Sequence, residues 1–152
     1  MTLFARGRRL FTSACIATLV VAALHTIGNT ISGPPPDPGY ASVEAAMRAY
    51  SIPLGIGMSP SIWDIFRGLV FTMSICLVAM GVLGLVVAGS REATPRLLSR
   101  MALVLALASA ALTALYWVYR VPPPLITMAV VTLLFVVALV TTRKSADARM
   151  AP

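Results

Sequence analysis

Apolar residues fill four long blocks of this chain, at 10–27, 65–88, 101–118 and 125–140, and polar residues gather between them. A helix needs roughly 20 residues to cross the ~30 Å hydrocarbon core of a bilayer, and about 17 to 25 are tolerated. Each block reaches that length with its interfacial flanks, and none alternates apolar and polar residues as a barrel strand does. The pattern therefore predicts four membrane-spanning α-helices.

The chain is expected to form one integral membrane domain of the all-α class. The expected architecture is a four-helix transmembrane bundle of two antiparallel hairpins, with a short extramembrane helix in the long first external loop. The domain covers 1–152, with spans at 10–28, 62–89, 99–119 and 123–142, an external loop at 29–61 holding a short helix at 41–51, and a cytoplasmic tail at 143–152.

The first block also has the features of a secretory signal, because a basic stretch precedes an apolar run. The run continues through Leu24 and Ile27 to full spanning length, so we expect a retained first helix rather than a cleaved signal. In the loop that follows, SGPPPDPGY favours a rigid polyproline-like turn. Helix formers come next, with Glu44 and Arg48 spaced as an i,i+4 ion pair.

Composition agrees with a membrane protein, since 59% of the residues are hydrophobic, 11% are charged and the mean hydropathy is +0.89. The net charge of +7 is unevenly spread. The basic residues on one side of the predicted membrane are Arg6, Arg8, Arg9, Arg91, Arg96, Arg100, Arg143, Lys144 and Arg149, and those on the other are Arg48, Arg67 and Arg120. This bias predicts that both termini are cytoplasmic and that the basic side attracts anionic lipid headgroups. No basic patch is interleaved with aromatic residues, so no nucleic-acid partner is expected.

Small residues should make the helix–helix interfaces, because lipid provides no hydrophobic drive for association. Rows of small residues at i+4 spacing are Ala106, Ala110 and Ala114; Gly68, Thr72, Cys76, Gly84 and Ala88, with Met80 completing the row; and Ala14, Thr18, Ala22, His25 and Asn29. The last row should point inward and carry His25 with it. Cys15 and Cys76 are expected to be small buried residues.

Polar and aromatic residues gather at the predicted outer face. His25 lies about 24 Å beyond Arg9, at 1.5 Å per residue, which puts it near the outer interface. Asp64 and Arg67 enter the membrane from that same side. The residues predicted to line a ligand-binding polar pocket are His25, Asp64, Arg67, Trp63, Tyr116 and Arg120.

Each of these residues also has a structural interpretation. Ser61 and Asp64 match a capping box, and Arg67 can pair with Asp64 or extend to lipid phosphates. The aromatic residues match an interfacial belt. His25 can make one interhelical hydrogen bond, although an ionisable group on an inward face is a functional candidate by default. If the chain has a site, we expect it between His25 and Arg67.

Several chemistries lack the residues they need. A single histidine cannot supply bis-histidine haem ligation, and the outer layer offers too few ligands for zinc or copper. The chain carries no nucleophile elbow, P-loop or dinucleotide fingerprint. The sequence therefore assigns no catalytic residue, no metal ligand and no cofactor.

The motif His25-x-x-Gly28, the proline-rich loop, AMRAYSIPL and SIWDIFRG resemble a family of small bacterial membrane proteins with four predicted helices. The resemblance implies the four-helix layout and a bacterial inner membrane, and it brings no assigned activity. Where related sequences have a second histidine after the glycine, this chain has Asn29, which argues against a two-histidine metal or haem site.

The leading functional hypothesis is a small, non-enzymatic inner-membrane protein. It would bind a lipophilic ligand, or act as an accessory subunit of a larger membrane complex, through the outer polar pocket. The alternative is a membrane-embedded enzyme acting on a quinone, isoprenoid or other lipid, with His25 as general base oriented by Asp64. A third hypothesis is a purely structural partner. The expected partners are the lipid bilayer and either a lipophilic small molecule or a larger membrane complex.

Overall fold

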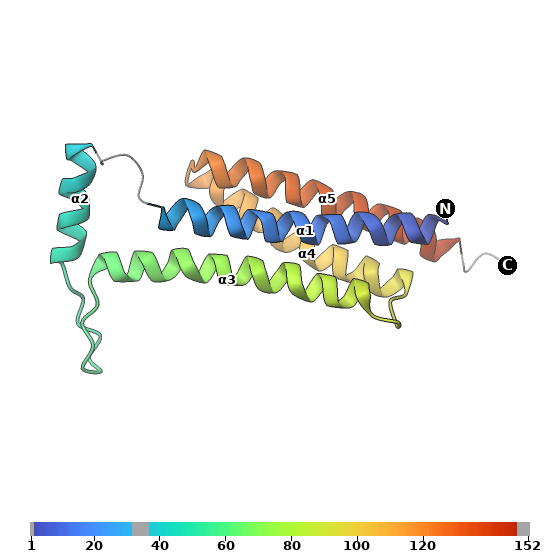
Figure 1. Cartoon of the computed structure of the whole chain (residues 1–152), viewed down its shortest axis with the longest axis horizontal. Coiled ribbons are helices and arrows are strands. Elements are labelled where there is room, and N and C mark those ends of the chain that lie inside the picture. The colour runs from blue at the N-terminus through green and yellow to red at the C-terminus, as the bar shows by residue number, and fades with distance from the viewer. Residues whose placement is uncertain (1, 32–36, 149–152) are drawn as a thin grey trace. The chain divides into compact units, whose positions relative to one another are not determined.

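The computed structural model describes residues 2–31 and 37–148, and within them the chain is all-helical (Figure 1). The helices in these two segments are α1 (Leu3–Thr30), α2 (Pro38–Ala49), α3 (Ile62–Gly89), α4 (Pro95–Val118) and α5 (Pro122–Asp147). The predicted all-α class is confirmed. Arg149, counted in the charge bias, and most of the proline-rich turn lie outside the described residues.

Four of these helices, α1, α3, α4 and α5, are long and apolar enough to cross a membrane, which indicates a multi-pass membrane protein. Helix α3 coincides with its predicted span, but α1 begins seven residues before position 10 and α5 continues five residues past position 142. Hydropathy marks the stretch suited to hydrocarbon, whereas a helix continues through polar turns as long as its backbone bonds do. The hairpin pairing of the spans and the extramembrane place of α2 stay predictions.

Helix starts follow local capping chemistry. Asp37 caps α2 by accepting a hydrogen bond from the Gly39 amide at 2.6 Å, so α2 begins three residues earlier than expected. Thr94 caps α4 by accepting from the Leu97 amide at 3.2 Å. Both helices, like α5, have proline in the first turn, where a missing amide donor costs nothing.

The contacts divide the chain into two compact units, which we describe separately. Unit 1 comprises Met1–Ala22 and Leu77–Pro152, and unit 2 comprises Ala23–Cys76. Unit 1 therefore holds most of α1, the second half of α3, and all of α4 and α5. Unit 2 holds the end of α1, α2 and the first half of α3.

The core of unit 1 is built around α1 and α5. Phe11 and Phe135 are both fully buried and meet edge to face, with ring centroids 6.0 Å apart. One turn nearer the N-terminus, Gly7 lies against Thr142, and a Cβ at Gly7 would approach the Thr142 Cγ2 to 2.9 Å. The missing side chain therefore lets α1 approach α5 closely. Helices α4 and α5 also pack against each other, joined by the short connection 119–121.

Two glycines bring α3 equally close to α1 within unit 1. A Cβ on Gly81 would lie 2.6 Å from the Leu19 Cγ and 3.1 Å from the Cys15 carbonyl oxygen, and a Cβ on Gly84 would overlap the Cys15 Sγ. Cys15 is fully buried, as expected. Backbone approach at small residues is the usual basis of helix association in lipid.

The predicted rows of small residues are confirmed in part. On α1, Ala14, Thr18 and Ala22 are buried as expected. On α3 the prediction was wrong for Gly68, Thr72 and Cys76, which are exposed. A row at strict i+4 spacing turns about 40° per step around a helix of 3.6 residues per turn, so it leaves the buried face within a few steps. The buried residues of α3 alternate three and four apart instead: Ser74, Leu77, Gly81, Gly84 and Ala88.

The variant Gly81→Ala tests the close approach of α3 to α1. Alanine gains up to about 1 kcal/mol of helix propensity over glycine, but overpacking at this contact costs about 1–3 kcal/mol. The variant should therefore unfold at a lower temperature than the parent protein when thermal unfolding is followed in detergent. Gly68→Ala is the matched control, because nothing lies within 4 Å of its added Cβ. Equal unfolding temperatures for the two variants would contradict the packing described.

Candidate functional site

The end of α1 is joined to α3 through Arg67 in unit 2. The Arg67 Nη1 donates a hydrogen bond to the Asn29 carbonyl oxygen at 2.6 Å. Asn29 lies in the last turn of α1, where carbonyls lack helical partners and the helix dipole favours a cation. The Arg67 guanidinium also lies over the Phe71 ring, with its Cζ 4.9 Å from the ring centroid. Arg67 is therefore held at the helix end by two contacts.

His25 is hydrogen-bonded to Asn29, the same residue of α1 that Arg67 contacts. The Asn29 side-chain amide donates to the His25 carbonyl oxygen at 2.7 Å, and the His25 Nδ1 lies 3.0 Å from the hydroxyl of buried Ser74. We call His25, Asn29, Arg67 and Ser74 the polar chain. In the polar chain both His25 and Arg67 are hydrogen-bonded to Asn29. From the sequence, a site was expected between these two residues. The polar chain also realises the structural interpretation of His25 as an interhelical hydrogen bond.

Asp64 takes part in the start of α3. Its Oδ2 accepts hydrogen bonds from the Ser61 amide at 3.0 Å and from the Ser61 hydroxyl at 2.7 Å, while the Asp64 amide donates to that hydroxyl at 3.1 Å. This is the predicted capping box. Among the described residues, no hydrogen bond or ion pair joins Asp64 to His25 or to Arg67. Of the two partners considered for Asp64 from the sequence, the structure therefore shows the serine and not the arginine.

The ring of Trp63 on α3 is covered by the guanidinium of Arg48 on α2. The Arg48 Cζ lies 4.5 Å from the Trp63 ring centroid, and Arg48 also pairs with Glu44 at 2.7 Å. The predicted i,i+4 pair is confirmed, whereas the stacking of Arg48 on Trp63 was missed. No local pattern predicts this contact, because a turning loop of 12 residues separates the two helices. Trp63 also contacts Phe66, with ring centroids 5.9 Å apart.

The remaining two predicted pocket residues belong to unit 1. Tyr116 is half-buried near the end of α4, and its carbonyl oxygen accepts a hydrogen bond from the Val121 amide at 3.0 Å. Arg120 is exposed in the following turn, with a left-handed φ of 54°. That all six predicted residues line one ligand-binding pocket stays a prediction. Within the described parts of the chain, no cluster of three or more His, Cys, Asp or Glu residues could hold a metal ion.

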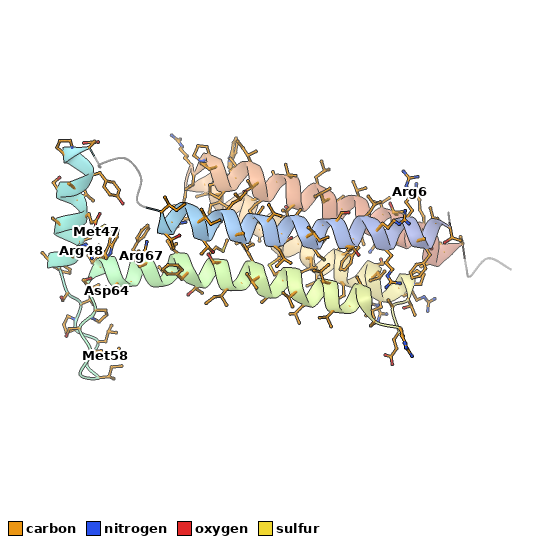
Figure 2. All side chains as sticks on the ribbon, in the orientation of Figure 1. Arg6, Met47, Arg48, Met58, Asp64 and Arg67 are labelled. Atoms are coloured by element: carbon orange, nitrogen blue, oxygen red, sulfur yellow. The ribbon has the colours of Figure 1, made fainter. Side chains whose placement is uncertain are left out.

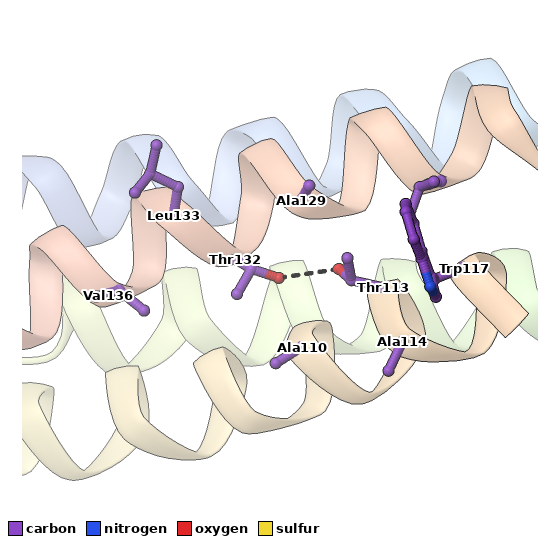
Figure 3. A pocket seen from close by; sticks show the side chains of 9 residues that line it. Ala110, Thr113, Ala114, Trp117, Ala129, Thr132, Leu133 and Val136 are labelled. Atoms are coloured by element: carbon purple, nitrogen blue, oxygen red, sulfur yellow. Dashed lines mark hydrogen bonds between the residues drawn. The ribbon is translucent and has the colours of Figure 1, made fainter.

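A groove between α4 and α5 is a second candidate site, and the sequence did not indicate it. Its volume is about 610 Å³. Its lining residues, most of which Figure 3 labels, are Ala110, Thr113, Ala114, Trp117, Leu125, Ala129, Thr132, Leu133 and Val136. We call it the α4–α5 groove. The row Ala106, Ala110 and Ala114 was expected to face another helix, but Ala114 is exposed and the last two residues line this groove.

Two threonine hydroxyls are the polar feature of the α4–α5 groove. The Oγ1 atoms of Thr113 and Thr132 lie 3.2 Å apart across it (Figure 3). Each hydroxyl also donates at 2.8 Å to a carbonyl of its own helix, at Ser109 and Met128. Each hydroxyl has one proton and two lone pairs, and these contacts use at most one of the four lone pairs, so the pair can accept a hydrogen bond from a donor placed in the groove.

A double-mutant cycle tests the His25–Ser74 contact. His25→Ala, Ser74→Ala and the double variant should give a coupling free energy of about 0.6 kcal/mol, the typical value for an interhelical hydrogen bond in a membrane protein. The measurement is the free energy of unfolding in bicelles. Pairing His25→Ala with Thr72→Ala is the control, since the exposed Thr72 hydroxyl bonds to its own helix at Gly68 and the two effects should add. A cycle with no more coupling than this control would refute the contact.

Arg67→Met tests the link from α3 to the end of α1. Methionine keeps an apolar stem but removes every donor, so the variant should lose about 1.5–3 kcal/mol of stability, the usual range for a hydrogen bond from a charged group. Arg67→Lys retains a cation and should lose less. Both are measured by unfolding in bicelles. A methionine variant as stable as the parent protein would show that the Asn29 carbonyl does not depend on Arg67.

No protein-family model matches the chain, and neither a curated protein nor a solved structure shows significant similarity to it. The case for a function therefore depends on the geometry of the polar chain and of the α4–α5 groove.

Proposed function

We propose that the protein is a small, non-enzymatic polytopic protein of a bacterial inner membrane that binds a lipophilic ligand in the α4–α5 groove. This keeps the class of function expected from the sequence and moves the binding site away from the polar layer. The observation that carries the proposal is the groove itself, an apolar depression between two helices that are each long enough to span a bilayer.

The size and lining of the α4–α5 groove suit a small lipophilic molecule. Its volume of about 610 Å³ falls within the roughly 300–1,000 Å³ range of ligand pockets, and its lining is apolar apart from the two threonines and the Trp117 indole. In a membrane, the exposed side of these helices faces lipid, so an apolar ligand reaches the groove without crossing water. Entry from the bilayer is the route that this proposal requires.

The shape of the α4–α5 groove favours a chain-like ligand over a compact one. Three of its lining residues are alanines, which leave depth between the helices. On α5 the lining extends from Leu125 to Val136, a rise of about 16 Å at 1.5 Å per residue. An acyl or isoprenoid chain lying along the helices matches an elongated depression of this kind.

The Thr113–Thr132 pair gives the groove one point of chemical selectivity. Its spare acceptor capacity favours a ligand with a hydroxyl or amide N–H close to the chain, because a donor in lipid has few other partners. Trp117 lines the same groove and is 71% exposed, so its indole N–H is free to contact a polar head. The preferred ligand is therefore a long apolar chain that carries one hydrogen-bond donor.

The polar chain is a weaker candidate for the binding site. The His25 Nδ1 already contacts Ser74, Arg67 contacts Asn29 and Phe71, and Asp64 is bound to Ser61. A ligand there would have to share these side chains with the protein contacts that already hold them. The alternative of a membrane enzyme needs Asp64 to orient His25, and the carboxylate instead caps α3.

The orientation proposed for the protein follows from charge. The basic residues at the ends of α1 and α5 and between α3 and α4 favour the cytoplasmic side, which leaves both termini inside. In this orientation the Trp117 end of the groove lies toward the outer leaflet. The ligand would then be a lipophile of that leaflet.

Crosslinking of a lipid-chain probe tests this function. The full-length protein in bicelles is exposed to a diazirine-bearing hexadecanol, whose hydroxyl supplies the donor, irradiated and digested. The crosslinks should map to residues 110–136, and the double variant Ala114→Leu/Ala129→Leu, which fills the groove, should lose them. Ala111→Leu is the matched control, because Ala111 is exposed on α4 but does not line the groove.

Equal labelling of the parent protein, the filled variant and the control would contradict the proposal, since it would mean that the probe samples the lipid-facing surface at random. A second possible result is a larger assembly that the filled variant no longer forms. That outcome would replace the small lipophile with a partner helix as the occupant of the groove.

A further inference from the structure

The loop between α2 and α3 forms a hairpin whose tip is apolar and exposed. Ser51 and Ser61 pair as an antiparallel bridge, and the Ile62 amide donates to the Tyr50 carbonyl at 3.0 Å. Further along, the Ile52 amide donates to the Pro60 carbonyl at 2.9 Å. We call residues 50–62 the apolar hairpin.

Three large side chains project from the tip of the apolar hairpin. Ile56 is 74% exposed, Met58 59% and Leu54 50%, and Met58 is seen at the end of the loop in Figure 2. Gly55 and Gly57, which flank Ile56, have φ values of 73° and 78°, a region that side chains avoid. The backbone is thus turned so that apolar side chains occupy the tip, and exposed apolar patches of this kind mark contact surfaces.

We propose that the tip of the apolar hairpin inserts into the headgroup–acyl boundary of the leaflet that α3 enters. This goes beyond the proposed function, because the hairpin belongs to unit 2 and shares no residue with the α4–α5 groove. The occupant of the exposed patch is then the lipid surface, and its role is to anchor the loop beside the membrane entry point of α3.

Charge favours lipid as the occupant. Between Arg48 and Asp64 the sequence has no charged residue at all, so no charge has to be dehydrated on insertion. Tyr50 is the first residue of the hairpin and Trp63 directly follows it, and these are the residue types enriched at the headgroup level. A protein interface more often includes a charged anchor such as arginine.

The short distance along the chain from the hairpin tip to α3 also favours lipid as the occupant. Ser61 directly precedes α3, a helix that could span the membrane, and Ile56 lies only six positions before Ile62. At about 3.3 Å per residue, the tip therefore lies within roughly 20 Å of the start of α3. If α3 spans the membrane, the membrane surface is therefore an apolar environment close to the tip.

The backbone sets the depth of insertion. The Leu54 amide donates to the Met58 carbonyl at 3.0 Å, and Pro53 and Pro60 have no amide hydrogen, so these positions can leave water without losing an amide hydrogen bond. Across the tip, no backbone hydrogen bond is found for the amides of residues 55–59. These amides need headgroups or interfacial water, which limits the tip to about 5–10 Å depth, as for other interfacial segments.

Spin-label accessibility tests this inference in the full chain, placed in nanodiscs of phosphatidylethanolamine and phosphatidylglycerol. Cys15→Ala and Cys76→Ala provide the background, and Ile56→Cys and Met58→Cys each receive a nitroxide. Both labels should collide more with oxygen, which concentrates in lipid, than with a water-soluble nickel chelate. A label at Ser42→Cys, on an exposed position of α2, is the control and should show the opposite preference.

Ile56→Asp supplies a second measurement in the Met58→Cys background. A carboxylate at the tip should withdraw the hairpin from lipid and reverse the oxygen preference of the label at position 58. Two results would overturn the inference. One is a preference for the nickel chelate at both tip positions, as at position 42; the other is exclusion of both reagents, which would indicate a protein partner, such as a second copy of the chain.

Discussion

The close approach of α1 to α3 and α5 inside unit 1 is the contact on which the rest of the structure depends. Lipid is as apolar as leucine, so helices in it associate through backbone proximity rather than through the hydrophobic effect. Gly7 provides this proximity to α5 beside Thr142, and Gly81 and Gly84 provide it to α3 beside Cys15. The α4–α5 groove lies in the same unit.

Polar atoms in the spans need hydrogen-bond partners within the protein, because a bilayer offers them no water. Among the described residues, no buried side-chain nitrogen or oxygen lacks a hydrogen-bond partner. Most threonine and serine hydroxyls in the spans return to a carbonyl of their own helix, as buried Thr18 and Thr142 do at 2.9 and 2.8 Å. The Thr113–Thr132 pair differs because its two hydroxyls also meet across two helices, in a groove that a ligand can enter. Their oxygen lone pairs are within reach of a donor there, which is why we regard the groove as a place for recognition.

Features governed by neighbouring residues could be predicted from the sequence. The four apolar helices follow from long apolar blocks, the capping box at Ser61 and Asp64 follows from residue spacing, and the Glu44–Arg48 pair follows from one helical turn. The partner of a helix face could not be predicted in the same way. A strict i+4 row leaves the buried face after a few turns, so Gly81 was missed while exposed Gly68 was included.

The candidate site was predicted less well for the same reason. Sequence depth brought His25 and Arg67 to one level, and the structure joins both to Asn29, but the hydrogen bonds leave these side chains engaged with the protein. The α4–α5 groove depends on how two helices pack along their length, which no local pattern reveals. The sequence shows the glycines and the uncharged run of the apolar hairpin, but not the positive φ values that place apolar side chains at its tip.

The most direct test of this account is a density map of the full-length protein purified in native lipid particles without detergent. The account predicts elongated non-protein density lying along the α4–α5 groove beside Thr113 and Thr132. An empty groove, together with ligand density enclosed by His25 and Arg67, would contradict it.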